Sequence, residues 1–200
     1  MPSARHHTTP SAPLPVMARA PRRSTYLRLA ALIIVALLLN GLVLFIPPQW
    51  IEGLGRWGPF AYLAVFGITA LANASVIVPI PYPGIVARFA SVLGDIWGVA
   101  LVGAAGSTVG ESTAFLVGRA GKGIVEDTRF FRWLSHQLRT PMRSFIILFL
   151  LSAPPNPFFD IAGLTAGTLG VSFPIFWTAT FLGRIIKMLF FAGLGRQLLG

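Results

Sequence analysis

The sequence contains no cysteine and few acidic residues. The absence of cysteine from all 200 residues excludes disulfide frameworks, thiolate metal sites and cysteine nucleophiles. Only 11% of the residues are charged, whereas about 25% are charged in an average soluble domain. Hydrophobic residues make up 54% of the chain, and its mean hydropathy is +0.73. This composition excludes an ordinary soluble domain and predicts an integral membrane protein.

The few charged residues are mostly basic. There are 16 Lys and Arg against 6 Asp and Glu, which gives a formal net charge of +10. Residues 1–28 contain five arginines and no acid, and residues 119–143 contain six basic and two acidic residues. Because these segments flank apolar runs, we expect them to meet the anionic headgroups of membrane lipids, and not nucleic acid.

Sequence motifs of soluble catalytic sites are missing. The chain has no HExxH, GxSxG or GxGxxG pattern. The glycines around Lys122 do not form a phosphate-binding loop, because no Ser or Thr follows the lysine and the spacing of the glycines is wrong. His136 is the only histidine outside the N-terminal tail. We therefore expect no enzymatic activity, no metal site and no cofactor.

Hydropathy divides the chain into two parts. Residues 1–27 are rich in Pro, Ala and Ser and predict a disordered basic tail. Residues 28–200 predict a single membrane domain. Its apolar runs are long enough to span a bilayer, and they lie at about 29–46, 59–78, 96–118 and 173–194. The basic loop 119–143 contains apolar and basic residues in the alternation of a helix that lies on the membrane surface.

Two proline clusters interrupt the apolar runs, and no helix continues through either. They comprise Pro79, Pro81 and Pro83, and Pro154, Pro155 and Pro157. The 35 residues from Gly84 to Gly118 are too many for one span and too few for two with a turn. We therefore expect half-membrane hairpins at about 79–95 and 144–171. The predicted fold is an all-α, polytopic membrane protein with two re-entrant helical hairpins.

A weak internal similarity supports an inverted repeat, which is a common plan of membrane transporters. Ala90–Gly94 resembles Ala166–Gly170, and the Gly118-Arg119 pair resembles Gly183-Arg184. The orientation in the membrane does not follow from these spans. Counting them from an inside N-terminus places the basic loop 119–143 outside, against the tendency of positive charge to stay inside.

Several ionisable residues lie within the apolar runs, where an isolated charge costs roughly 2.5–3.5 kcal/mol to insert. Glu111 lies in the third predicted span, and Arg184 and Lys187 lie one turn apart near the centre of the last. Two cations inside a membrane need anions. The candidates are Glu111, Asp160, Asp95 or a bound anionic headgroup, since Arg can bind a phosphate through two donors.

The second proline cluster predicts a further part of this site. Asn156 can cap the half-helix that follows it, whose free N–H groups favour an anion. Asp160 lies near the start of the same half-helix, and Arg88 lies one turn into the corresponding half-helix of the first hairpin. Two alternatives stay open: the buried charges only hold helices together, and Arg88 reaches an interface beside a simple kink.

The stretch from Pro79 to about Gly195 resembles the DedA family, also called VTT-domain or SNARE-associated Golgi-like membrane proteins. The residues that carry this resemblance are Ala90–Gly94 with Trp97 and Gly98, Gly106-x-x-x-Gly110-Glu111, Gly118-Arg119, Pro154–Asp160, Ala166-Gly167, Phe176 and Gly183. The resemblance implies two facing re-entrant hairpins and a role in moving phospholipids or polyprenyl-phosphate carriers between leaflets. It also implies functional roles for Glu111, Arg119 and Asp160, and protons as a coupling ion.

Taken together, these patterns predict a flippase- or scramblase-like protein that moves an anionic lipid, with anionic lipid headgroups as its partners. The expected location is the cell membrane, either plasma or inner, in preference to an organelle membrane. A homo-oligomer is compatible with the sequence. Two alternatives are a proton- or sodium-coupled transporter of small solutes, with Glu111 as the titrating group, and a scaffold that transports nothing.

Overall fold

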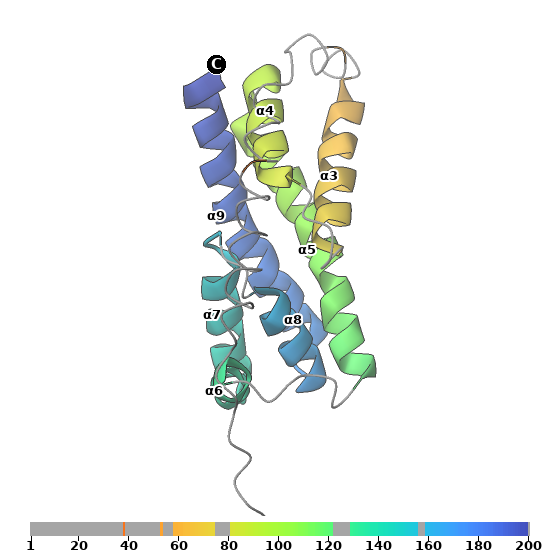
Figure 1. Cartoon of the computed structure of the whole chain (residues 1–200), viewed down its shortest axis with the longest axis vertical. Coiled ribbons are helices and arrows are strands. Elements are labelled where there is room, and N and C mark those ends of the chain that lie inside the picture. Colours follow the sequence, from red (N-terminus) through yellow and green to blue (C-terminus); the bar gives the residue numbers. More distant parts are fainter. Residues whose placement is uncertain are drawn as a thin grey trace, which may run out of the picture.

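The described part of the chain is entirely helical. The computed structural model describes residues 58–74, 81–121, 129–155 and 159–199, with isolated positions 38 and 53. The predicted tail 1–27 and the predicted span 29–46 lie outside these residues, apart from Leu38. Seven helices are described: α3 (Pro59–Ala74), α4 (Tyr82–Leu93), α5 (Ile96–Ala120), α6 (Arg129–Gln137), α7 (Pro141–Ser152), α8 (Phe159–Thr168) and α9 (Phe173–Leu199) (Figure 1).

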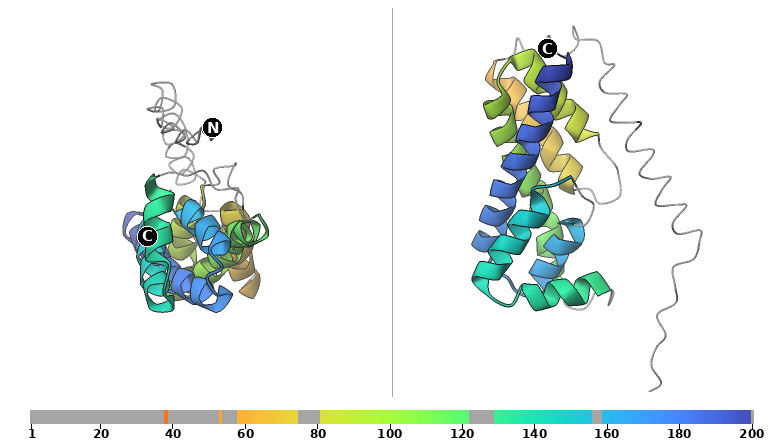
Figure 2. Two further views of the ribbon diagram at one scale, coloured as in Figure 1. Left: turned by 90° about the horizontal axis from the view of Figure 1, so that it is seen from below. Right: turned by 90° about the vertical axis from the view of Figure 1, so that its left-hand side faces the viewer.

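Helices α5 and α9 form the long central pair of the bundle. They run in opposite directions and pack against each other (Figures 1 and 2). With 25 and 27 residues, they are the two described helices that are long and apolar enough to cross a membrane. At 1.5 Å per residue they measure about 38 and 40 Å, against about 30 Å for the hydrocarbon core. A helix long and apolar enough to span a membrane therefore occupies each of the predicted ranges 96–118 and 173–194, and α9 continues to Leu199.

Two pairs of shorter helices occupy opposite ends of the bundle. Helix α3 runs from the upper end to about half height, and α4 returns to the upper end (Figure 1). Helix α7 rises from the lower end to about half height, and α8 returns to the lower end (Figure 1). These four helices have 16, 12, 12 and 10 residues. Their lengths are about 15–24 Å, which is less than a full span.

The first of these pairs differs from the predicted hairpin. The predicted span 59–78 contains α3, Pro59–Ala74, and residues 75–80 lie outside the described part. The range 79–95, predicted as a hairpin, contains the single helix α4. The helices on either side of the first proline cluster are therefore α3 and α4. Hydropathy could not separate them, because the apolar run continues from α3 to the prolines.

Pro83 lies at the start of a helix, in agreement with the prediction that a half-helix containing Arg88 follows the first proline cluster. It lies in the first turn of α4, directly after Tyr82, and Pro81 precedes the helix. A missing N–H costs nothing in the first turn, because the first four N–H groups of a helix have no partner within it. The range 144–171 of the second predicted hairpin contains most of α7 and all of α8. Pro154 and Pro155 follow α7 as exposed bends, whereas Pro79 and Pro157 lie outside the described residues.

The two short return helices end in similar ways. Gly94 follows α4 with a φ of 65°, and Gly170 follows α8 with a φ of 73°. This left-handed conformation suits glycine and allows a sharp turn into the next helix. Asp95 then caps α5, accepting hydrogen bonds from the Gly98 N–H at 2.9 Å and the Tyr62 hydroxyl at 2.7 Å. These bonds hold the pKa of Asp95 below its usual value, so the cap stays ionised.

Glycines on α5 and α9 allow each long helix to contact two shorter ones at backbone distance. A Cβ at Gly106 would meet the backbone of α3, and one at Gly118 would meet α8. On α9, a Cβ at Gly183 would meet α7, and one at Gly195 would meet α4. Gly106 and Gly183 are 77 residues apart, and so are Gly118 and Gly195.

The contacts of these glycines favour a different alignment of the two halves from the predicted one. The predicted alignment matches Gly118 with Gly183, but Gly118 faces α8, which follows the second proline cluster, whereas Gly183 faces α7, which precedes it. The contacts instead align Gly106 with Gly183. That alignment agrees with the other predicted match, in which Gly94 corresponds to Gly170, 76 residues later.

The amphipathic helix predicted in the loop 119–143 is α6, at the lower end of the bundle (Figure 1). Leu134 is buried, as is Leu138 just beyond the helix, whereas Arg129, Arg132 and Trp133 are exposed. The outer residues of the predicted loop belong to other elements, since α5 ends at Ala120 and α7 begins at Pro141. The basic face of α6 is therefore available at one end of the bundle.

Candidate functional site

Four of the seven side chains predicted for the site are buried inside the bundle. Their exposed fractions are 5% for Arg88, 1% for Glu111, 2% for Arg184 and 6% for Lys187. Arg88 comes from α4, Glu111 from α5, and the two others from α9. The structure thus gathers charges from three helices in its interior, where an isolated charge is costly.

Glu111 and Arg184 form an ion pair between the two long helices. Arg184 is the twelfth residue of α9, and Glu111 is the sixteenth of α5, so the pair lies well inside both helices. Arginine stays protonated even when buried, and a buried guanidinium therefore requires a nearby anion. Among the candidate anions, Glu111 is the one that pairs with Arg184, whereas Asp95 caps α5.

An aromatic ring lies near each of the two buried cations of α9. The guanidinium carbon of Arg184 lies 4.9 Å from the centre of the Phe159 ring, and the Lys187 Nζ lies 5.8 Å from that of Tyr82. Both distances are within the range of a cation–π interaction. Tyr82 is the first residue of α4 and Phe159 is the first residue of α8. The inner ends of both return helices therefore meet at the charged site.

Two buried hydroxyl groups flank the ion pair. Ser107 lies one turn before Glu111 on α5, and Thr180 lies one turn before Arg184 on α9; both are fully buried. Neither hydroxyl oxygen has a hydrogen-bond partner within the described part of the chain, and the same holds for the Nε of Arg184. Buried polar atoms are almost always satisfied by protein or bound molecules. These three atoms can therefore accept or donate hydrogen bonds to a ligand or to water.

The remaining predicted residues do not join this cluster in the described structure. Arg119 is exposed at the end of α5, where its guanidinium carbon lies 5.9 Å from the centre of the Phe115 ring. Asp160 is the second residue of α8, but its side chain lies outside the described part. Asn156 also lies outside it. The described contacts of the site therefore involve Glu111, Arg184 and Lys187, and Arg88 is buried on the neighbouring helix α4.

Tyr82 and Phe159 are the site residues that the sequence analysis did not identify. Aromatic residues are common in apolar runs, so neither residue attracts attention on its own. Both, however, lie at or next to a proline cluster and begin a helix, and they are 77 residues apart. That shared position was the available signal.

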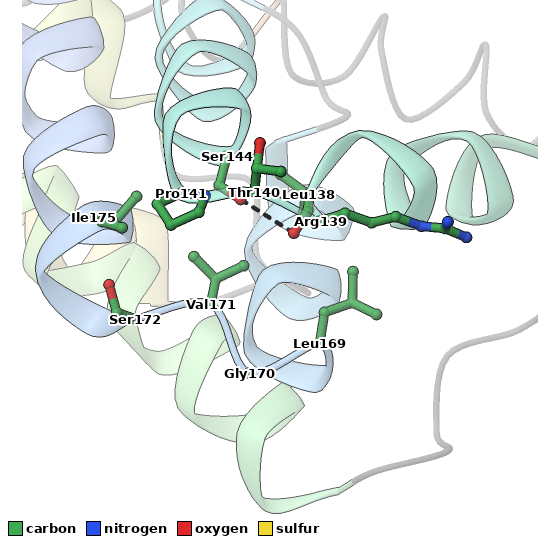
Figure 3. A pocket seen from close by; sticks show the side chains of 10 residues that line it. All are labelled: Leu138, Arg139, Thr140, Pro141, Ser144, Leu169, Gly170, Val171, Ser172 and Ile175. Carbon is green, nitrogen blue, oxygen red and sulfur yellow. Dashed lines mark hydrogen bonds between the residues drawn. The ribbon is translucent and has the colours of Figure 1, made fainter.

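A pocket of about 300 Å³ lies at the lower end of the bundle, away from this cluster. It opens between the turn 138–141, before α7, and the turn 169–172, before α9 (Figure 3). Its lining is mixed, and none of the predicted site residues belongs to it. The described residues also contain no group of His, Cys, Asp and Glu that could hold a metal ion.

The helical bundle, its two apolar central helices and the buried charges between them define a membrane-associated helical protein. The model of the VTT domain, the domain of the DedA proteins, matches residues 80–197. The chain therefore belongs to the VTT-domain family, as its resemblance implied. Searches among characterised proteins and among solved structures found no match to the chain.

Proposed function

We propose that this protein moves an anionic lipid, a phospholipid or a polyprenyl phosphate, from one leaflet of a membrane to the other. The observation that carries the proposal is the presence of guanidinium and ammonium groups in the interior of the bundle, beside an ion pair. Arg184 and Lys187 are buried one turn apart on α9, and Glu111 pairs with Arg184. Guanidinium and ammonium groups are the side chains that bind phosphate, so the cluster suits an anionic headgroup.

The arrangement of charges suits release as well as binding. In the empty site Glu111 neutralises Arg184, which lowers the cost of keeping a guanidinium buried. An arriving phosphate competes with Glu111 for the same donors and can also bind Lys187, one turn further along α9. Return of Glu111 to Arg184 then favours departure of the headgroup. Transport needs such an exchange, whereas catalysis would need reactive groups beyond these.

The membrane arrangement that we propose has two re-entrant hairpins, α3/α4 and α7/α8, in an inverted repeat. It is supported by their short helices, by their opposite positions in the bundle (Figure 2) and by the 77-residue spacing of the contact glycines. In this arrangement only α5 and α9, together with the predicted span 29–46, cross the bilayer. We place the protein in the plasma or inner membrane, as a monomer or a homo-oligomer.

This arrangement also removes the conflict over orientation. If α3 and α4 return to the same face, the chain crosses once less before the basic loop. The basic tail and α6 then lie on the same side, in agreement with the positive-inside tendency. Single cysteines replacing Ser3 and Arg139 are expected to react with an impermeant thiol reagent from one side, and Leu198→Cys from the other. The native chain has no cysteine, so the background is clean. Reaction of all three from one side would contradict the arrangement.

The proposed activity can be tested in liposomes with a fluorescent anionic phospholipid. We expect Arg184→Ala and Glu111→Gln to slow transbilayer movement by roughly tenfold or more, because each removes a charged contact worth about 1.5–3 kcal/mol. Arg196→Ala is the matched control, since Arg196 is an exposed arginine on the same helix. Unchanged lipid movement in both site variants would contradict the proposal. Uptake of a small solute driven by a pH gradient, without lipid movement, would favour a coupled solute transporter instead.

A further inference from the structure

The two return helices contact the cations of α9 in the same way. Each begins with an aromatic residue, and each of these rings lies over one cation: Tyr82 over Lys187 and Phe159 over Arg184. The rings are 77 residues apart, which is the spacing of the contact glycines. The pattern therefore occurs once in each half of the bundle.

The environment of the rings makes these contacts effective. Phe159 and Arg184 are each 2% exposed, and Lys187 is 6% exposed, so the cations have lost most of their water. Cation–π attraction is strongest under such desolvated conditions. It is still weaker than charge-assisted hydrogen bonding between a guanidinium and a phosphate. A ring can therefore hold a cation in the empty site and yield it to an anionic headgroup.

We propose that Tyr82 and Phe159 are two gates. Each ring blocks access to the buried cations from one end of the bundle. Tyr82 begins α4 of the upper hairpin and Phe159 begins α8 of the lower one, so the two rings come from hairpins at opposite ends of the bundle (Figure 1). The inference rests on the proposed transport site and adds how access to it is controlled. An anionic headgroup that enters from one end displaces one ring, while the other ring stays closed.

Two small buried residues serve as reporters for the two ends. Helix α5 descends, so Ser107 lies on the upper side of Glu111; α9 ascends, so Thr180 lies on the lower side of Arg184 (Figure 1). Both are fully buried. Cysteine is similar in size to serine and threonine, so it fits at both positions. Ser107→Cys reports opening toward the upper end, and Thr180→Cys reports opening toward the lower end.

The test measures the rate at which each cysteine reacts with an impermeant thiol reagent, added to one side of oriented vesicles. We expect Tyr82→Ala to speed the reaction of Ser107→Cys from the upper side by roughly tenfold or more. Phe159→Ala should do the same for Thr180→Cys from the lower side. The ring-retaining variants Tyr82→Phe and Phe159→Tyr should stay near the background rate.

The crossed combinations are the matched controls. In these combinations the labelling rate should remain at background: Ser107→Cys combined with Phe159→Ala, and Thr180→Cys combined with Tyr82→Ala. A background rate there also shows that the bundle is folded. Equal labelling of both cysteines in either ring variant, or no labelling in the matched pairs, would overturn the proposal. Should the alanine variants fail to fold, Tyr82→Leu and Phe159→Leu preserve most of the volume but lack the π face. Side-specific labelling is expected for them as well, and its absence overturns the proposal.

The labelling requires no lipid substrate, so its result is separate from the liposome assay. Side-specific opening without lipid movement would support the gates and contradict only the proposal that a lipid is the transported molecule. Lipid movement with no effect of ring removal on labelling would disprove the gates and leave the transport proposal standing.

Discussion

Glu111→Met is expected to destabilise the protein by about 3–5 kcal/mol, the usual cost of leaving one partner of a buried ion pair uncompensated. Arg184 would remain charged at 2% exposure with its carboxylate removed. Thermal unfolding of the purified protein in detergent measures the effect. Methionine suits the position because it is apolar, flexible and of similar length. A loss below about 1 kcal/mol would show that Arg184 has another anion within reach.

The double variant Glu111→Met/Arg184→Met separates structure from function. Replacing both members of a buried ion pair by apolar residues is often neutral or stabilising, so we expect most of the lost stability to return. Lipid movement should stay low, because the phosphate would have lost its guanidinium. A double variant that is stable and fully active would mean that the pair serves only packing, as in the scaffold alternative.

The second large effect is expected at Gly195. A Cβ there would overlap the backbone of Ala87, so Gly195→Ala must push α4 away from α9. We expect a loss of about 1–3 kcal/mol, as for other overpacked sites. Gly193→Ala is the matched control two residues earlier on the same helix, where a Cβ would meet nothing within 4 Å.

Gly193→Ala should be neutral or stabilising by up to about 1 kcal/mol, because alanine favours a helix more than glycine does. Thermal unfolding compares the two variants under identical conditions. Lipid movement should also fall in Gly195→Ala, since α4 carries both Tyr82 and Arg88. Equal stabilities for the two variants would contradict the close approach of α4 and α9.

The long helices and the buried charges could be predicted because both follow from the cost of polar groups in an apolar medium. That cost requires Arg184 to have an anion, and the structure supplies Glu111. The pairing of helices around the first proline cluster could not be predicted from hydropathy. The apolar run does not reveal that α3 and α4 are the helices on either side of the cluster.

The alignment of the two halves could not be predicted from the sequence, for a different reason. A glycine in an apolar run indicates that a backbone comes close, but not which one. Gly118 and Gly183 both precede an arginine, yet they contact helices of different kinds. The roles of Tyr82 and Phe159 likewise depend on where α9 places its cations, which is settled only by tertiary packing.

The separation of Glu111 from Arg184 has a consequence for biogenesis. The carboxylate is synthesised 73 residues before the guanidinium that neutralises it. A nascent chain that ends before α9 therefore lacks the guanidinium that pairs with Glu111 in the folded protein. The ion pair between α5 and α9 thus forms only after the last helix has been made.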